Sequence, residues 1–139
     1  MSENLEELSM QIRIAIMVSP MPFLRAFAGT GVRRRRQSIG SLEIGERVSK
    51  NVSAMFRFYE NGRRVEREEL ADFLCQHLLA VPDATAKQVT DKNADVRSEA
   101  IDVVAAGFIE ALAANWTISY EPPTPVLPGQ GLKFHGPSK

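Results

Sequence analysis

The spacing of apolar residues at the start of the chain predicts a helix over residues 3–18. Apolar residues recur there at the three- and four-residue intervals of one helical face, namely Leu5, Leu8, Ile12, Ala15 and Ile16. The second half also shows the alternation of β-branched residues that favours a strand, so a strand over residues 11–18 stays open. Pro20 and Pro22 end either element because proline lacks an N–H group, and we expect a short helix over 23–28.

The pattern then breaks, which predicts an exposed basic loop over residues 29–45. Four glycines interrupt every periodicity in this stretch, namely Gly29, Gly31, Gly40 and Gly45. The run Arg33–Arg36 lies between them, and four adjacent guanidinium groups cannot be buried together. We expect a helix to begin near the end of this loop and to cover about 43–52.

The next stretch predicts a β-hairpin. Residues 53–59 fit one helical face, yet their aromatic residues are also typical of a strand, so helix or strand stays open here. The pair Asn61 and Gly62 favours the strand, because both residues tolerate the positive φ of a tight hairpin turn. We therefore predict a strand over about 54–59 and a return strand over 63–66.

The second half of the chain returns to helical spacing. We expect helices over 66–81, 83–93 and 96–114, and a strand over 116–120 that pairs with the one at 54–59. Between Ala100 and Ala114 the last helix carries only two charged residues, so it is buried on most sides or partly forms an oligomer interface. Gly107 and Ala111 lie four residues apart and form a candidate helix interface, since small residues allow close approach.

These elements predict an α+β fold that is predominantly helical and has a small antiparallel sheet, with an all-α bundle as the alternative. We expect residues 1–120 to form a single globular domain. Residues 121–139 are rich in proline and glycine, which predicts an extended or disordered tail.

Composition narrows the functional classes. A single cysteine excludes an internal disulfide, and one cysteine with two histidines cannot supply a four-ligand zinc site, so we expect no metal or cofactor. The longest uncharged run near the N-terminus, Ile14 to Leu24, is too short to span a bilayer, which needs about 20 residues. The acidic residues before that run also argue against a signal peptide. We expect a soluble, intracellular protein with no membrane partner.

The balance of charge hides an asymmetry that points to a partner. Lys and Arg number 17, as do Asp and Glu, so the formal net charge is zero. Residues 1–60 hold nine basic and six acidic residues, a net of +3, whereas residues 61–139 hold eight and eleven, a net of −3. Arg33–Arg36 would contact an acidic partner protein, another copy of this chain, or phosphates. For phosphates, the set extends to Arg47, Lys50 and Arg57.

The tail offers a second candidate contact. Its prolines match the PxxP spacing of polyproline-II recognition, namely Pro122, Pro123, Pro125 and Pro128. Phe134 would serve as an apolar anchor if the tail lies across a partner.

We find no catalytic constellation in the sequence. Cys75 and His77 are two residues apart, and on a helix such residues do not face each other. The expected function is therefore a non-catalytic interaction or assembly protein, such as an adaptor, inhibitor or structural subunit, using the basic loop and the tail. A small protein of a phage or other mobile element fits this profile. The alternative is a nucleic-acid-binding or regulatory protein that contacts phosphates through Arg33–Arg36, although the pI near 6.7 is low for that class.

Overall fold

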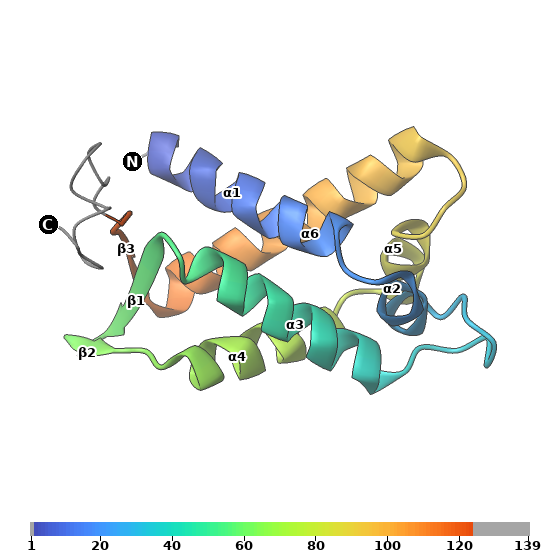
Figure 1. Ribbon diagram of the computed structural model, residues 1–139, viewed down its shortest axis with the longest axis horizontal. Coiled ribbons are helices and arrows are strands. Elements are labelled where there is room, and N and C mark those ends of the chain that lie inside the picture. The colour runs from blue at the N-terminus through green and yellow to red at the C-terminus, as the bar shows by residue number, and fades with distance from the viewer. Residues whose placement is uncertain (1, 124–139) are drawn as a thin grey trace, which may run out of the picture.

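The computed structural model describes residues 2–123, in which helices enclose a core and a small sheet lies at one end (Figure 1). The helices are α1 (Ser2–Met17), α2 (Met21–Ala28), α3 (Ser38–Val52), α4 (Arg67–Leu79), α5 (Asp83–Gln88) and α6 (Ala94–Asn115). The strands are β1 (Phe56–Glu60), β2 (Arg63–Arg64) and β3 (Thr117–Tyr120), in the order β2-β1-β3. The predicted α+β, predominantly helical class is confirmed, and the sheet excludes the all-α alternative.

The core joins helices from both halves of the chain. α3 packs against α1, α2 and α4, and α6 crosses behind α1 and closes the other side (Figure 1). Large, fully buried side chains come from six elements and include Leu8, Ile12, Phe27, Ile44, Phe56, Leu74 and Phe108. Burying one such side chain stabilises the fold by about 1.5–3 kcal/mol, so these contacts fix the ends of the loop between α2 and α3.

The sheet follows the predicted pairing. β1 lies between the other two strands, and both pairs are antiparallel, with Tyr59 opposite Arg64 and Phe56 opposite Tyr120. Asn61 has φ 52° and Gly62 has φ 85°, the left-handed conformations that a two-residue hairpin turn requires. The hairpin prediction is confirmed, although the return strand is shorter than predicted because it ends at Arg64.

Both ambiguous stretches are settled by burial. Over residues 11–18 the helical period prevails: Ile12 and Ile16 are buried, whereas Ile14, which an alternating strand would place on the same face, is 42% exposed. Over residues 53–59 a turn at 53–55 leads into a strand that begins at Phe56, two residues later than predicted, and Phe56 and Phe58 alternate into the core.

The prediction of a loop over residues 29–45 is wrong at its C-terminal end. α3 begins at Ser38, five residues before the predicted helix start, and Gly40 and Gly45 are helical and buried. A Cβ atom at Gly40 would lie 2.3 Å from the backbone nitrogen of Phe27, and one at Gly45 would lie 3.1 Å from that of Cys75. These glycines let α2 and α4 approach α3 closely. The connection that remains, residues 30–37, is called the arginine loop below.

Candidate functional site

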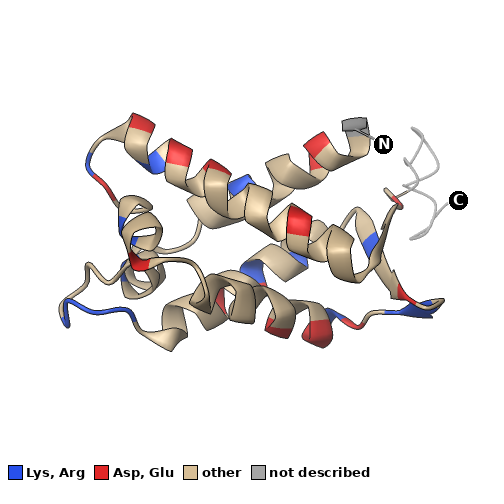
Figure 2. Ribbon diagram, turned by 180° about the vertical axis from the view of Figure 1, so that it is seen from behind, with Lys and Arg blue, Asp and Glu red and all other residues tan. Residues whose placement is uncertain are grey.

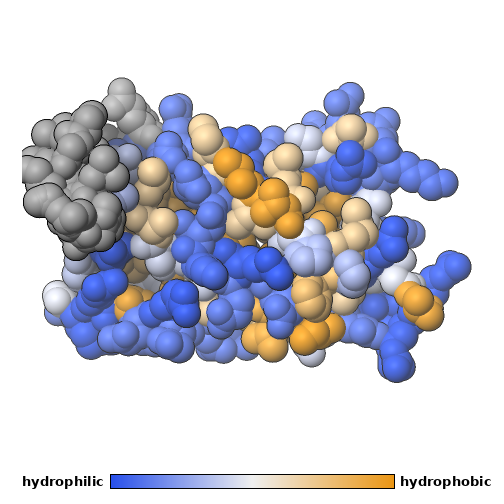
Figure 3. Space-filling view, viewed as in Figure 1, coloured by the Kyte–Doolittle hydropathy of each residue, from blue (hydrophilic) through white to orange (hydrophobic). Residues whose placement is uncertain are grey.

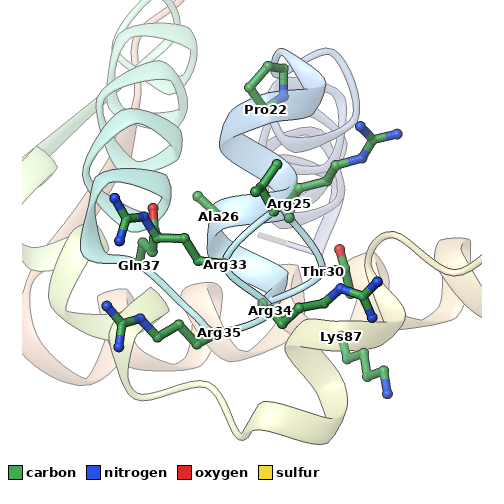
Figure 4. Close-up of a pocket in the computed structure, with 12 residues that line it drawn as sticks. Pro22, Arg25, Ala26, Thr30, Arg33, Arg34, Arg35, Gln37 and Lys87 are labelled. Atoms are coloured by element: carbon green, nitrogen blue, oxygen red, sulfur yellow. The ribbon is translucent and has the colours of Figure 1, made fainter.

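The arginine loop borders a hollow of about 900 Å³ at the end of the molecule opposite the sheet (Figures 1 and 4). Five cationic side chains line it, from α2, the loop and α5, namely Arg25, Arg33, Arg34, Arg35 and Lys87. Pro22, Ala26 and Thr30 are among the uncharged residues of the lining, and no aspartate or glutamate contributes to it. This cationic hollow can therefore accept several negative charges, which its own lining does not neutralise.

Three of the four consecutive arginines have no partner in the described part of the chain. Arg33, Arg34 and Arg35 are exposed, and their side chains form no ion pair or hydrogen bond with residues 2–123. Val32 at the tip of the loop is fully exposed as well, so an apolar side chain accompanies the charges. This tip is consistent with the predicted role of the arginine run as a contact.

Arg36 differs from its neighbours, and here the prediction of a fourth exposed contact is wrong. Its Nε donates a hydrogen bond to the carbonyl of Phe27 at 2.8 Å, and its Nη2 donates to the carbonyl of Leu78 at 2.8 Å. Nη1 donates to the carbonyl of Val81 and pairs with the carboxylate of Asp83 at 3.1 Å. The guanidinium also lies over the Phe27 ring, 4.9 Å from its centroid. These contacts join the loop to α2, α4 and α5.

The other end of the arginine loop is also held. The hydroxyls of Thr30 and Thr90 share a hydrogen bond of 2.8 Å, and the backbone N–H of Gly29 donates to the carbonyl of Arg25 at 2.8 Å. Gly29 has φ 81° and ends α2 in the left-handed region, a conformation that glycine favours. The loop is thus fixed at both ends, with its free arginines between them.

The remaining predicted phosphate contacts do not join this site. Arg47 and Lys50 are exposed on α3 and are absent from the lining of the hollow. Arg57 lies on β1, where its guanidinium donates to the carbonyls of Ser53 and Phe56. The predicted seven-residue cationic set is therefore divided among three places rather than gathered on one surface.

Charges at the sheet end neutralise one another (Figure 2). Arg63 donates to Glu60 at 2.8 Å and to both carboxylate oxygens of Glu69, at 2.8 and 3.0 Å. The hydrogen bonds from Arg63, and a further one from the backbone of Glu66, lower the pKa of Glu69 to about 2. In Figure 2 the blue and red segments alternate at this end, whereas the arginine loop carries one continuous blue stretch with no red in it.

Of the predicted small-residue interface on α6, Gly107 packs within the chain. Gly107 faces α4, where a Cβ atom would lie 3.0 Å from Nε2 of His77, while Ala111 is half-buried. The His77 ring packs on Phe108 with centroids 4.8 Å apart, and burial lowers the pKa of His77. Cys75 is buried, and burial raises the pKa of its thiol, so it lacks the thiolate character of a nucleophile.

A second exposed surface is apolar. Large hydrophobic side chains of α1 and the turn into α2 remain 42–69% exposed, namely Met10, Ile14, Met17, Val18 and Met21. Figure 3 shows a band of hydrophobic side chains across this face where α1 lies. Such a band is typical of a surface that contacts another protein.

The tail is only partly within the described residues. Pro122 and Pro123 are exposed and follow Glu121, whose N–H donates to the carbonyl of Met55 at 2.7 Å. The other predicted docking residues, Pro125, Pro128 and Phe134, lie outside the described residues. None of the helices described is both long and apolar enough to cross a membrane.

Two cationic residues of the hollow are not predicted from the sequence. Arg25 and Lys87 are 62 positions apart in the sequence and come together only because α2 packs against α5. Their isolated positions give no pattern that could have revealed them. Comparisons of the chain with protein families, curated proteins and solved structures found no match.

Proposed function

We propose that the protein is a non-catalytic binding protein, such as an adaptor, inhibitor or structural subunit, whose cationic hollow docks on an acidic segment of a partner protein. One observation carries the proposal: five cationic side chains line the hollow without a carboxylate among them. Arginine suits this role, because its planar guanidinium binds carboxylates through two parallel hydrogen bonds.

The arrangement favours an extended acidic segment over a single small anion. In Figure 4 the guanidinium groups of Arg33 and Arg35 lie on one side of the loop, and those of Arg25 and Arg34 on the other. Charges spread in this way match several carboxylates along a chain better than one compact ion. The exposed Val32 at the loop tip and the apolar band on α1 supply the uncharged contact that protein interfaces combine with charge.

Nucleic acid is the competing partner. The arginine run supports it, but Arg47, Lys50 and Arg57 do not extend the hollow into a track for a phosphate backbone. The formal net charge of zero also gives little of the long-range attraction on which non-specific nucleic-acid binding depends. These two observations support an acidic protein segment over nucleic acid as the partner that we propose.

A binding titration separates the two partners. Fluorescence anisotropy would follow a labelled hexaglutamate peptide and a labelled hexathymidylate at low and at physiological salt. We expect the peptide to bind more tightly, and the double variant Arg33→Ala/Arg35→Ala to weaken its binding without lowering the melting temperature, because neither side chain has a partner within residues 2–123.

Two outcomes would overturn the proposal. If the peptide fails to bind at low salt, the hollow is not a site for acidic segments. If the oligonucleotide binds more tightly and is released as salt rises, the assignment moves to nucleic acid.

Two further parts of the proposal concern assembly and the tail. The acidic partner can be another copy of this chain, which light scattering across a concentration series would detect. Deleting residues 124–139 keeps the Glu121 hydrogen bond to the sheet, so any loss of partner capture in that variant is assigned to the tail. We place this activity inside the cell, in keeping with the single cysteine.

A further inference from the structure

We infer that Arg36 is the positioning residue of the cationic hollow: it does not meet the ligand but holds Arg33, Arg34 and Arg35 in the arrangement that binds it. The inference rests on the proposed function, because it concerns how that same site is organised. It goes beyond it by giving four adjacent residues of one type two different tasks.

The contacts of Arg36 are those of an internal anchor. Its side chain is 20% exposed, and its hydrogen bonds reach three carbonyls, those of Phe27, Leu78 and Val81. These carbonyls lie at or just beyond the C-terminal ends of α2 and α4, where helix dipoles favour a cation. One guanidinium therefore satisfies the carbonyl of Phe27, which the end of α2 leaves without an intrahelical partner, and adds a donor to that of Leu78, which also accepts from the Val81 N–H.

The anchor fits closely around the start of the loop. A Cβ atom at Gly29 would lie 3.1 Å from Cγ of Arg36, so the stem of this arginine packs on the last turn of α2. The backbone N–H of the next residue, Gln37, donates to the carbonyl of Ala26 at 2.8 Å. Arg36 and Gln37 thus fix the end of the loop against the helix from which the loop departs.

The backbone conformation of Arg34 indicates that these contacts hold the loop in one arrangement. Arg34 has φ 57°, a left-handed conformation that residues with a Cβ atom adopt at a cost. Its N–H donates to the carbonyl of Gly31 at 3.0 Å, which closes a turn within the loop. A costly backbone conformation persists only when its surroundings impose it, and here Arg36 and the Thr30–Thr90 hydrogen bond are those surroundings.

Held in this way, the backbone that carries the three free arginines need not be ordered by the ligand. Ordering long side chains and a loop on binding weakens affinity, and an arrangement formed in advance reduces that loss. Removing Arg36 should therefore weaken binding even though every cation that meets the ligand is still present.

The test measures hexaglutamate binding by anisotropy for Arg36→Gln, Arg36→Lys and a control, Val52→Ala. Val52 is buried at the far end of α3, so its truncation lowers stability without touching the hollow. We expect Arg36→Gln to weaken hexaglutamate binding by about tenfold. This is the smallest loss of affinity usually seen at metal sites when a residue that orients the metal ligands is removed. Arg36→Lys should recover part of the loss, since lysine keeps the positive charge but lacks the planar guanidinium that donates several hydrogen bonds at once. Amide hydrogen exchange over residues 30–37 should rise in Arg36→Gln and stay unchanged in the control.

The outcomes separate this inference from the proposed function. If Arg33→Ala/Arg35→Ala weakens binding but Arg36→Gln binds as tightly as Val52→Ala, the function stands and the positioning role of Arg36 is wrong. If neither the double variant nor Arg36→Gln alters binding, the proposed function itself fails.

Discussion

The two ends of the molecule use arginine in opposite ways. At the sheet end, Arg63 pairs with Glu60 and Glu69, and Arg57 donates to backbone carbonyls. At the loop end, Arg33–Arg35 have no side-chain partner within residues 2–123 and border a hollow free of carboxylates. Since natural folds commonly place opposite charges near one another, a concentration of unneutralised cations is the more informative feature.

The comparison also shows that a charge run is not one functional unit. Arg36 is adjacent to Arg35 in the sequence, yet it behaves like the arginines of the sheet end, because its guanidinium is occupied within the fold. What matters is the set of acceptors around each guanidinium.

The largest effect is expected from Gly40→Ala. The added Cβ atom would lie 2.3 Å from the backbone nitrogen of Phe27 and 2.6 Å from the carbonyl oxygen of Phe23, so α2 and α3 must separate. We expect this substitution at the loop end to lower the unfolding free energy of the protein by about 3 kcal/mol. At the sheet end, Gly62→Ala has open space and pays only for its positive φ, about 1 kcal/mol. Urea unfolding measures both, and equal losses would show that α2 and α3 do not pack as described.

A smaller loss should distinguish the anchor from a free arginine. Arg36→Ala leaves the carbonyls of Phe27 and Val81 without a donor within residues 2–123, and we expect it to lower the unfolding free energy by about 2 kcal/mol. Arg35→Ala should change it by less than about 0.5 kcal/mol, as is usual for surface positions. Thermal unfolding of the two variants side by side is sufficient. Similar melting temperatures would remove the distinction between them.

A modest gain is expected from Arg34→Gly. Glycine adopts φ 57° freely, and we expect a gain of about 0.5 kcal/mol after subtracting the entropy that glycine adds to the unfolded chain. Asn61→Gly at the hairpin should give a smaller gain in unfolding free energy, since asparagine tolerates a positive φ. Chemical denaturation measures the unfolding free energies of the two variants and so tests this prediction. A loss of stability in Arg34→Gly would mean that the left-handed conformation carries no cost.

The smallest effect concerns pH at the sheet end. The pKa of Glu69 falls from 4.5 to about 2, chiefly through its hydrogen bonds with Arg63, so ionised Glu69 stabilises the fold above pH 4.5. This contribution is lost as pH falls from 4.5 towards 2, because over that window the unfolded state binds a proton at Glu69 that the folded state does not. Glu69→Gln lacks this titration, and the stability difference between it and the unaltered protein should shrink over that window. A constant difference from pH 7 to pH 2.5 would contradict the pairing.

Sequence patterns predicted the elements well where local chemistry decides them. Asn61 and Gly62 have few alternatives to a tight turn, and both residues adopt the positive φ that this turn requires. Gly40 was misinterpreted for a physical reason. A glycine lowers helix propensity, but propensity is weak beside the packing of two helices, and the partner helix cannot be seen in the local sequence.

The site was predicted only in part for the same reason. The arginine run is visible as a charge cluster, yet whether each guanidinium is free depends on acceptors remote in sequence, such as Leu78 and Val81 for Arg36. Arg25 and Lys87 join the hollow through the contact of α2 with α5, which no spacing rule encodes. The sequence therefore predicts where positive charge is concentrated, and the fold determines which of the cationic side chains are free to bind a ligand.

Paired charge removal tests the central claim most directly. Arg33→Ala/Arg35→Ala and Arg63→Ala/Arg64→Ala each remove two positive charges, one pair from each end of the molecule. At low salt, the loop variant should weaken hexaglutamate binding by about tenfold or more, since hydrogen bonds between ionised groups are lost, while the sheet variant should bind like the unaltered protein. Equal weakening by the two variants would show that binding follows net charge alone, and would contradict a site at the cationic hollow.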